Sequence, residues 1–141
     1  MARPTHPMQR LLLAVLLAAT LTLPVRAGEK ANTVIIHPGE VVYAHFEMKG
    51  KKIKLLGFSK EKDAGAQVIF TLQPDEKKTN LMLKVENKFT QDLLYKVEMR
   101  SLTKKKKFSM PLTPVVGGKI ALETLPIVVE ELAAFEFQLE K

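Results

Sequence analysis

The sequence predicts an all-β protein, a single antiparallel β-sandwich of seven to nine strands that follows a cleavable leader. Apolar and polar residues alternate along most of the chain after residue 40, as in strands whose successive side chains point to opposite faces of a sheet. Turn-forming residues interrupt the alternation about every 8–12 residues, which is typical of antiparallel sandwiches and barrels. The first 27 residues have the composition of an export signal.

The amino-terminal segment has a charged start, an apolar centre and small residues before a cleavage point, in the order found in secretory signal peptides. Its apolar run covers residues 11–23, and these 13 residues are fewer than the roughly 20 that a membrane-spanning helix needs. Val25 and Ala27 stand at the −3 and −1 positions of a cut. We therefore predict a signal peptide over residues 1–27 and one mature domain over residues 28–141.

The composition of the mature domain favours a bacterial cell envelope. The chain has no cysteine, although small exported domains of eukaryotes often carry disulfides. None of its asparagines lies in an N-x-S/T sequence, and Gly28 stands where a lipoprotein would need cysteine. No second apolar run in the mature chain reaches the length of a membrane span. We expect the domain to be exported, either to the periplasm or into the medium.

The charge of the chain is basic and unevenly distributed. The full sequence carries 22 basic and 15 acidic side chains, a net charge of +7. The net charge is about +4 without the three arginines of the signal peptide. Residues 28–107 carry 17 basic and 10 acidic side chains, whereas residues 108–141 carry 2 and 5. Such an asymmetry steers anionic partners toward the first part of the domain, but it does not determine the fold.

The predicted strands follow the alternating stretches in order. These stretches lie at residues 42–48, 68–72, 81–85, 93–99, 120–122 and 135–139. Turn residues lie at 37–40, 49–51, 63–65, 73–76, 87–92 and 111–118. We expect Met48 to fill the core beside Phe46, because methionine packs into irregular gaps. We also expect Ile120, Leu122 and Phe135 to point inward.

Residues 127–134 fit two local structures. Their apolar side chains have helical spacing, and Pro126 suits the first turn of a helix. The segment is short for a helix, however, and an alternating pattern follows it directly. We favour extended structure with a bulge near Ala133 and Ala134, and keep a short helix as the alternative.

Four elements in the second half of the domain carry a family resemblance. They are Leu81-x-Leu83-x-Val85-x-Asn87, Leu94-Tyr95, the segment from Pro114 to Gly118, and Glu123-x-Leu125-Pro126. Over residues 79–139 the chain resembles small exported bacterial proteins that have an immunoglobulin-like β-sandwich and no assigned activity. The resemblance implies an immunoglobulin-like fold and transfers no active site. The chain lacks the two cysteines and the tryptophan of true immunoglobulin domains.

The residues that common catalytic sites require are scarce. A hydrolytic triad needs a nucleophile, a base and a third group that orients the base. The mature domain has two histidines, His37 and His45, and three serines, none of them in a G-x-S-x-G motif. Glu130 and Glu131 are adjacent, so in a strand they would point to opposite faces. We therefore predict that the protein is not an enzyme and holds no cofactor.

A metal site is not expected either. Histidine and methionine side chains of exported proteins bind copper, and His45 and Met48 are the most suitable pair. Their spacing of three residues places them on opposite faces of a strand, where they cannot share one ion.

Two lysine clusters are the candidate binding residues. They are Lys49, Lys51, Lys52 and Lys54 around one predicted turn, and Lys104, Lys105, Lys106 and Lys107 in a later connection. Such clusters bind anionic glycans or lipid headgroups by releasing counterions. Nucleic acid is a less suitable ligand, because the domain has few aromatic residues for base stacking. Alternatively, the lysines are solvated and keep sheet edges from pairing.

Two proline-bounded apolar segments, residues 111–116 and 125–129, would bind a partner if they were exposed. More simply, they close the ends of the core. Because small sandwiches often present recognition surfaces on a rigid frame, we predict a non-enzymatic binding or scaffolding module of the bacterial cell envelope. Its partner would be an envelope protein, and the alternative is a binder of anionic glycans or headgroups through the lysine clusters.

Overall fold

The computed structural model describes residues 32–50, 52–101, 103–126 and 128–140, so the predicted signal peptide lies outside the described residues. Nine antiparallel strands form one sheet, and the described residues include no helix. Accordingly, this part of the chain offers no apolar helix of membrane-spanning length. The strands are β1 (Val34–Ile36), β2 (Glu40–Lys49), β3 (Lys52–Ser59), β4 (Val68–Pro74), β5 (Asn80–Asn87), β6 (Asp92–Ser101), β7 (Lys106–Ser109), β8 (Ile120–Pro126) and β9 (Glu131–Glu140). The predicted all-β class is confirmed.

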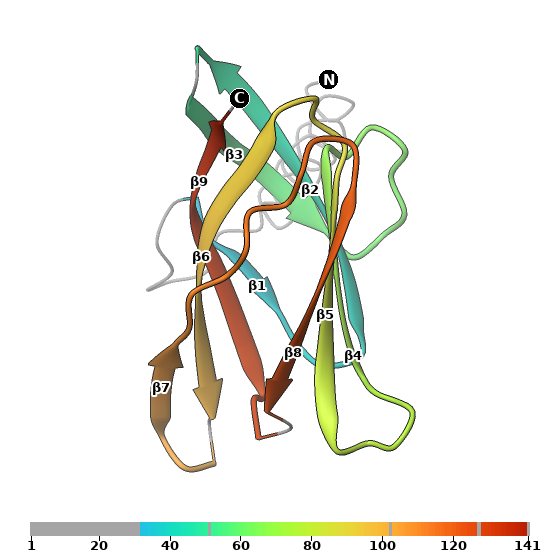
Figure 1. Ribbon diagram of the computed structural model, residues 1–141, viewed down its shortest axis with the longest axis vertical. Helices are drawn as coiled ribbons and strands as arrows, with labels where there is room; N and C mark the ends of the chain where they lie inside the picture. The colour runs from blue at the N-terminus through green and yellow to red at the C-terminus, as the bar shows by residue number, and fades with distance from the viewer. Residues whose placement is uncertain (1–31, 51, 102, 127, 141) are drawn as a thin grey trace, which may run out of the picture.

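The sheet curls so that its two halves face each other around the core (Figure 1). The strand order is β7-β6-β9-β3-β2-β4-β5-β8, and β1 pairs with β9. We call β3, β2, β4, β5 and β8 the β8 arm, and β1, β9, β6 and β7 the β7 arm. The two arms join where Lys52 of β3 pairs with Gln138 of β9. Among the described strands, β7 and β8 therefore lie at the two ends of this strand order.

Side chains from both arms fill the space between them. The predicted alternation is confirmed in β4, β5 and β6, and in the first part of β2. The buried residues of these strands include Val42, Ala44, Phe46, Val68, Phe70, Leu72, Leu81, Leu83, Val85, Leu93, Tyr95, Val97 and Met99.

Aromatic rings tie the two arms together at the centre of the core. The ring of Phe137 in the β7 arm lies 4.9 Å from that of Phe46 and 6.2 Å from that of Phe70, both in the β8 arm. Tyr95 stacks on Phe137 at 6.2 Å. Burial of one large apolar side chain stabilises a fold by about 1.5–3 kcal/mol, so this cluster is a main contact between the arms.

The prediction that Met48 fills the core was wrong. Its side chain is 48% exposed, whereas Phe46 is buried. Met48 pairs with Ile53 near the β2–β3 turn, at the tip of the hairpin that stands at the top of Figure 1. The alternation of β2 thus continues past the end of the core.

The prediction that Ile120 and Leu122 point inward was also wrong. The two residues are 56% and 62% exposed. They pair with Glu86 and Lys84, which lie on the outer face of β5, and cross-strand partners share a face. The inner face of β8 consists instead of Ala121, Glu123 and Leu125.

β9 is extended, which confirms the favoured prediction for its residues and excludes the helix over 128–134. The predicted position of the bulge was wrong, because Ala133 and Ala134 pair regularly with β6. The ladder shifts further on, where Leu94 pairs with Gln138 and Lys96 pairs with Phe135. The extra residue is Glu136, whose φ of 53° is left-handed.

The bulge at Glu136 changes which positions of β9 face the core. Leu132 and Ala134 are buried before it, and Phe137 and Leu139 are buried after it. Phe135 therefore lies on the outer face, contrary to prediction, although it fits the apparent alternation with Phe137.

The turn between β5 and β6 fixes the position at which β8 begins. The amide of the buried Asn87 donates hydrogen bonds to the main-chain oxygens of Gln91 (2.9 Å) and Val115 (3.0 Å). Gly117 packs so closely that a Cβ atom there would lie 2.1 Å from the carbonyl oxygen of Thr90. The chain consequently enters β8 along one defined path.

Candidate functional site

The outer face of the β8 arm contains a shallow hollow of about 620 Å³ over β2, β4, β5 and β8. Two rows of cross-strand partners cross this face. One row is Tyr43, Ile69, Glu86 and Ile120, and the next is Val41, Thr71, Lys84 and Leu122. The lining combines apolar side chains such as Ile69 and Leu122 with the polar Thr71 and Lys84. Apolar surface with a few polar groups suits an apolar or extended ligand.

β8 forms one side of this hollow and is also an open sheet edge. The main-chain N–H of Asn87 donates to the oxygen of Lys119 (3.0 Å), so Lys119 and every second residue after it turn their main-chain groups toward β5. The N–H and C=O groups of Ile120, Leu122 and Thr124 therefore point away from β5. Among the described residues, none of the main-chain hydrogen bonds outside the strand ladders involves these three residues.

Among the described residues, the connection from β7 to β8 makes no main-chain hydrogen bond to this edge. It follows the edge of β6, where Val115 exchanges two hydrogen bonds with Leu93 (2.8 and 2.9 Å). It approaches β8 through a side chain, since the N–H of Thr113 donates to Oε1 of Glu123 at 3.4 Å. Glu123 faces inward, so this contact lies on the inner side of β8. The exposed Ile120 and Leu122 lie on the other side.

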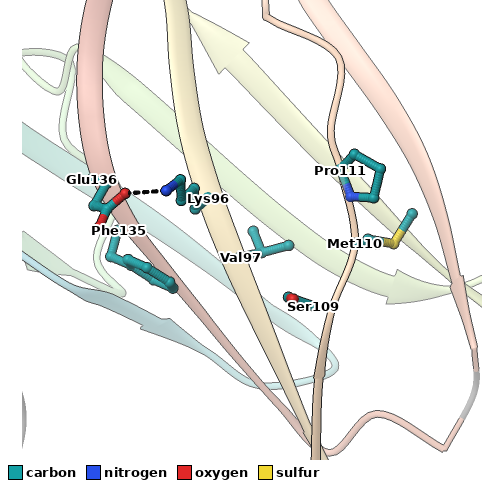
Figure 2. Close-up of a pocket in the computed structure, with 7 residues that line it drawn as sticks. All are labelled: Lys96, Val97, Ser109, Met110, Pro111, Phe135 and Glu136. Carbon is teal, nitrogen blue, oxygen red and sulfur yellow. Dashed lines mark ion pairs between the residues drawn. The ribbon is translucent and has the colours of Figure 1, made fainter.

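A second hollow, of about 470 Å³, lies on the outside of the β7 arm (Figure 2). The bulge turns Glu136 outward, where its carboxylate pairs with Lys96 at 2.7 Å. Met110 and Pro111 line the hollow from the connection after β7. Both charged side chains are more than half exposed, so the ion pair contributes little to the stability of this surface.

A network of charged side chains joins the β1–β2 turn to the β7 arm. The ring of His37 contacts Glu40 through Nδ1 (3.0 Å) and Glu131 through Nε2 (3.1 Å). Arg100 donates to Glu131 (2.6 Å) and to Glu98 (3.0 Å), and Lys60 pairs with Glu40. Both ring nitrogens of His37 are engaged by carboxylates, so the ring is held in place.

The two carboxylates beside His37 have lowered pKa values. Burial raises the pKa of Glu131, but hydrogen bonds from Arg100 and His37 outweigh it. Burial likewise raises the pKa of Glu40, and bonds from Lys60 and His37 outweigh it. The network therefore stabilises the ionised carboxylates, and its geometry indicates a structural role.

His45 forms a second pair, with Asp63 in the loop after β3. The distance from Nε2 to Oδ2 is 2.6 Å, and a hydrogen bond from the N–H of Gly65, followed by that from His45, lowers the pKa of Asp63. The Ser59 hydroxyl, near the end of β3, accepts a bond from the N–H of Glu61. His45 and Met48 lie on opposite faces of β2. No group of three or more metal-ligating side chains occurs within the described ranges.

The structure separates the two lysine clusters. Lys49, Lys52 and Lys54 are exposed on the β2–β3 hairpin, and Lys104, Lys105, Lys106 and Lys107 are exposed at the β6–β7 turn, while Lys51 is not among the described residues. Lys52 pairs with Gln138, and Gln138 pairs with Leu94 of β6, so Lys52 and Leu94 lie at the same height in the sheet. Leu94 comes seven residues before Ser101, the last residue of β6. At about 3.3 Å per residue, the heights of Lys52 and Ser101 in the sheet differ by about 23 Å. The clusters accordingly lie at opposite ends of the molecule (Figure 1).

Comparisons of the chain with protein-family models, with curated proteins and with solved structures find no match. The β8 surface was not predicted, because the alternation in the sequence suggests that Ile120 and Leu122 point inward. The His37 network was not predicted, because Glu131 lies 94 residues from His37.

Proposed function

We propose that the protein is an exported, non-enzymatic binding module of the bacterial cell envelope, and that it recognises its partner with β8 and the adjoining hollow. In this proposal the signal peptide at residues 1–27 is removed and the mature domain has an immunoglobulin-like sandwich architecture. Two facing arms with antiparallel strands support that architecture. The use of such a frame for recognition is an analogy with other small sandwiches.

The observation that carries the proposal is the combination of an open edge with apolar side chains. β8 is seven residues long, its outer edge is unpaired among the described residues, and Ile120 and Leu122 are more than half exposed. An unpaired edge offers main-chain hydrogen bonds to an added strand, and exposed apolar side chains beside it supply contact area. The hollow extends this surface over three neighbouring strands.

Site-specific photo-crosslinking in the bacterial envelope tests the proposal. A photoreactive phenylalanine derivative replaces Leu122 in one strain and Leu56 in another, because Leu56 is equally exposed but lies on β3. We expect a discrete adduct from position 122 and none from position 56. Similar adducts from both positions, or none from position 122, would contradict the proposal. Amino-terminal sequencing of the envelope protein is expected to start at Gly28.

Anion binding through the lysines is the second candidate. Lys104, Lys105 and Lys106 are exposed, and none of them forms an ion pair with another described residue. Because the clusters lie far apart, each would bind a polyanion independently. On a heparin column, replacement of residues 104–107 by glutamine and of residues 49, 52 and 54 by glutamine should lower the eluting salt concentration additively. No change in either variant would contradict anion binding.

A further inference from the structure

We propose that the occupant of the β8 edge is β8 of a second copy, paired antiparallel about a twofold axis at Ala121. The inference depends on the proposed function, because it names the partner of the same surface. It is carried by the segment from Lys119 to Glu123, with sequence Lys-Ile-Ala-Leu-Glu. When two copies of this segment are paired antiparallel, an apolar residue lies opposite an apolar residue and a lysine lies opposite a glutamate.

The hydrogen-bonding phase of β8 permits this pairing. The main-chain groups of Ile120 and Leu122 point to the open edge, as the bond between Asn87 and Lys119 requires. With the axis at Ala121, Ile120 of one copy lies opposite Leu122 of the other. Each such pair exchanges an N–H···O=C bond in both directions. The groups that the fold leaves unpaired are thus the groups that the dimer uses.

The side chains match on both faces of the extended sheet. On the outer face, Ile120 of each copy packs beside Leu122 of the other and covers two residues that are 56% and 62% exposed. On the inner face, Lys119 of each copy lies opposite Glu123 of the other. Directly opposed residues of opposite charge stabilise an antiparallel pair, and like charges destabilise it.

Neighbouring registers lack this complementarity. An axis at Glu123 would place the two Glu123 carboxylates opposite each other, and an axis at Leu122 would leave Lys119 opposite Leu125. The length of the paired segment is also limited by the chain. Gly118, with a left-handed φ of 70°, precedes it, and Pro126, which has no N–H donor, ends it. The axis at Ala121 is therefore the register that the sequence favours.

Sedimentation velocity of the exported chain, from roughly 1 µM to 1 mM, tests the proposal. We expect a reversible monomer–dimer equilibrium. Lys119→Glu alone and Glu123→Lys alone should each weaken the dimer by about tenfold, because each places like charges opposite one another twice. The double variant should restore the dimer, and a mixture of the two single variants should form a heterodimer. Lys104→Glu, a charge change at the β6–β7 turn, should have no effect.

A proline at position 120 tests the main-chain bonds separately. The N–H of Ile120 points away from β5, so Ile120→Pro removes a donor from the edge but none from the β5–β8 ladder. Thermal unfolding identifies any variant that fails to fold, and the mixture of the two charge variants does not depend on a single variant's stability. We expect Ile120→Pro to be folded and monomeric.

The outcomes separate the two proposals. A photo-adduct from position 122 at twice the chain mass, together with the charge-swap pattern, supports the dimer. A monomer at every concentration, with an adduct of a different mass, overturns the dimer and leaves the binding module intact. A monomer without any adduct contradicts both. If none of the charge variants changes the strength of dimerisation, the proposed register is overturned.

Discussion

The curled sheet ends in two free edges of opposite character. β7 is four residues long and starts with Lys106 and Lys107, directly after two further exposed lysines. β8 is seven residues long and exposes Ile120 and Leu122. Short, lysine-rich edges prevent sheets from associating, whereas long apolar edges promote it. One end of this strand order thus has the features of a protected edge, and the other has the features of a contact surface.

The comparison of the two edges offers a second explanation for the lysines at residues 104–107. In the sequence, residues 104–107 form the most conspicuous cluster and are a candidate anion site. In the fold, they lie at and beside the short edge strand, where such charges would disfavour pairing with another strand. The anion-binding hypothesis stays a prediction, and the edge-protecting alternative has a location that suits it.

The largest expected effect concerns the entry of the chain into β8. We expect Gly117→Ala to lower the free energy of unfolding by about 3 kcal/mol or more, because the added Cβ atom would overlap the main chain at Thr90. Gly57→Ala is the matched control, since nothing lies within 4 Å of its added Cβ atom. Urea unfolding measures both variants. Equal small effects would show that β8 is not held at this point.

Exchanging the character of the two edges should change association more than stability. We expect Ile120→Lys with Leu122→Lys to weaken self-association at least about tenfold, because lysines on the β8 edge would disfavour pairing with another strand. The reciprocal variant, Lys106→Ile with Lys107→Leu, should create a new concentration-dependent association. Sedimentation velocity measures both. The comparison fails if the β8 variant associates as strongly as the parent chain.

Acid should loosen the contact between the β1–β2 turn and β9, where Glu40 and Glu131 flank His37. Glu131 and Glu40 have pKa values in the fold below the ordinary glutamate value of 4.5, so protonation favours the unfolded chain. Their contribution is complete above about pH 4.5 and is lost as the pH falls through the lowered values. We expect hydrogen exchange near pH 3 to increase first in β1 and β9. Glu131→Gln should remove about 1 kcal/mol of stability at neutral pH and flatten the acid dependence.

The smallest effect is expected where the two arms face each other without a polar contact. The Tyr95 hydroxyl is buried and finds no hydrogen-bond partner among the described residues, and its burial, with the nearby Glu123 carboxylate, raises its pKa. We expect Tyr95→Phe to raise the free energy of unfolding by about 1 kcal/mol, because it removes an unsatisfied polar group. Calorimetry measures the change. A loss of stability would reveal a partner for the hydroxyl.

Strands with a paired neighbour on each side were the most predictable from sequence. β5 and β6 have paired strands on both sides and the other arm on one face, so burial imposes a strict period of two on Leu81, Leu83, Val97 and Met99. β8 has a partner on one side only, and its apolar residues include outward ones. An alternating apolar pattern therefore occurs both where the apolar residues face the core and in β8, where some of them face outward. Only the pairing with β5 distinguishes the two cases.

The candidate site was less predictable because it depends on distant pairings. Whether Ile120 faces inward is decided by its register with Glu86, 34 positions earlier in the chain. The position of the bulge depends on how Tyr95 meets Glu136 and Phe137, and no local signal distinguishes that point from Ala133. Periodicity identifies strands, but the faces of an edge strand are known only after its neighbour is known.

The bulge at Glu136 has a consequence for the shape of the molecule. A chain that lacked this one residue would still turn Phe137 and Leu139 inward, because the regular period would then run through Ala134 to Phe137. The pattern of core residues therefore does not require Glu136. A bulge bends its strand and increases the local twist, and this one lies just before Gln138, where the two arms meet. The corner at which the sheet folds back thus depends on a residue that contributes nothing to the core.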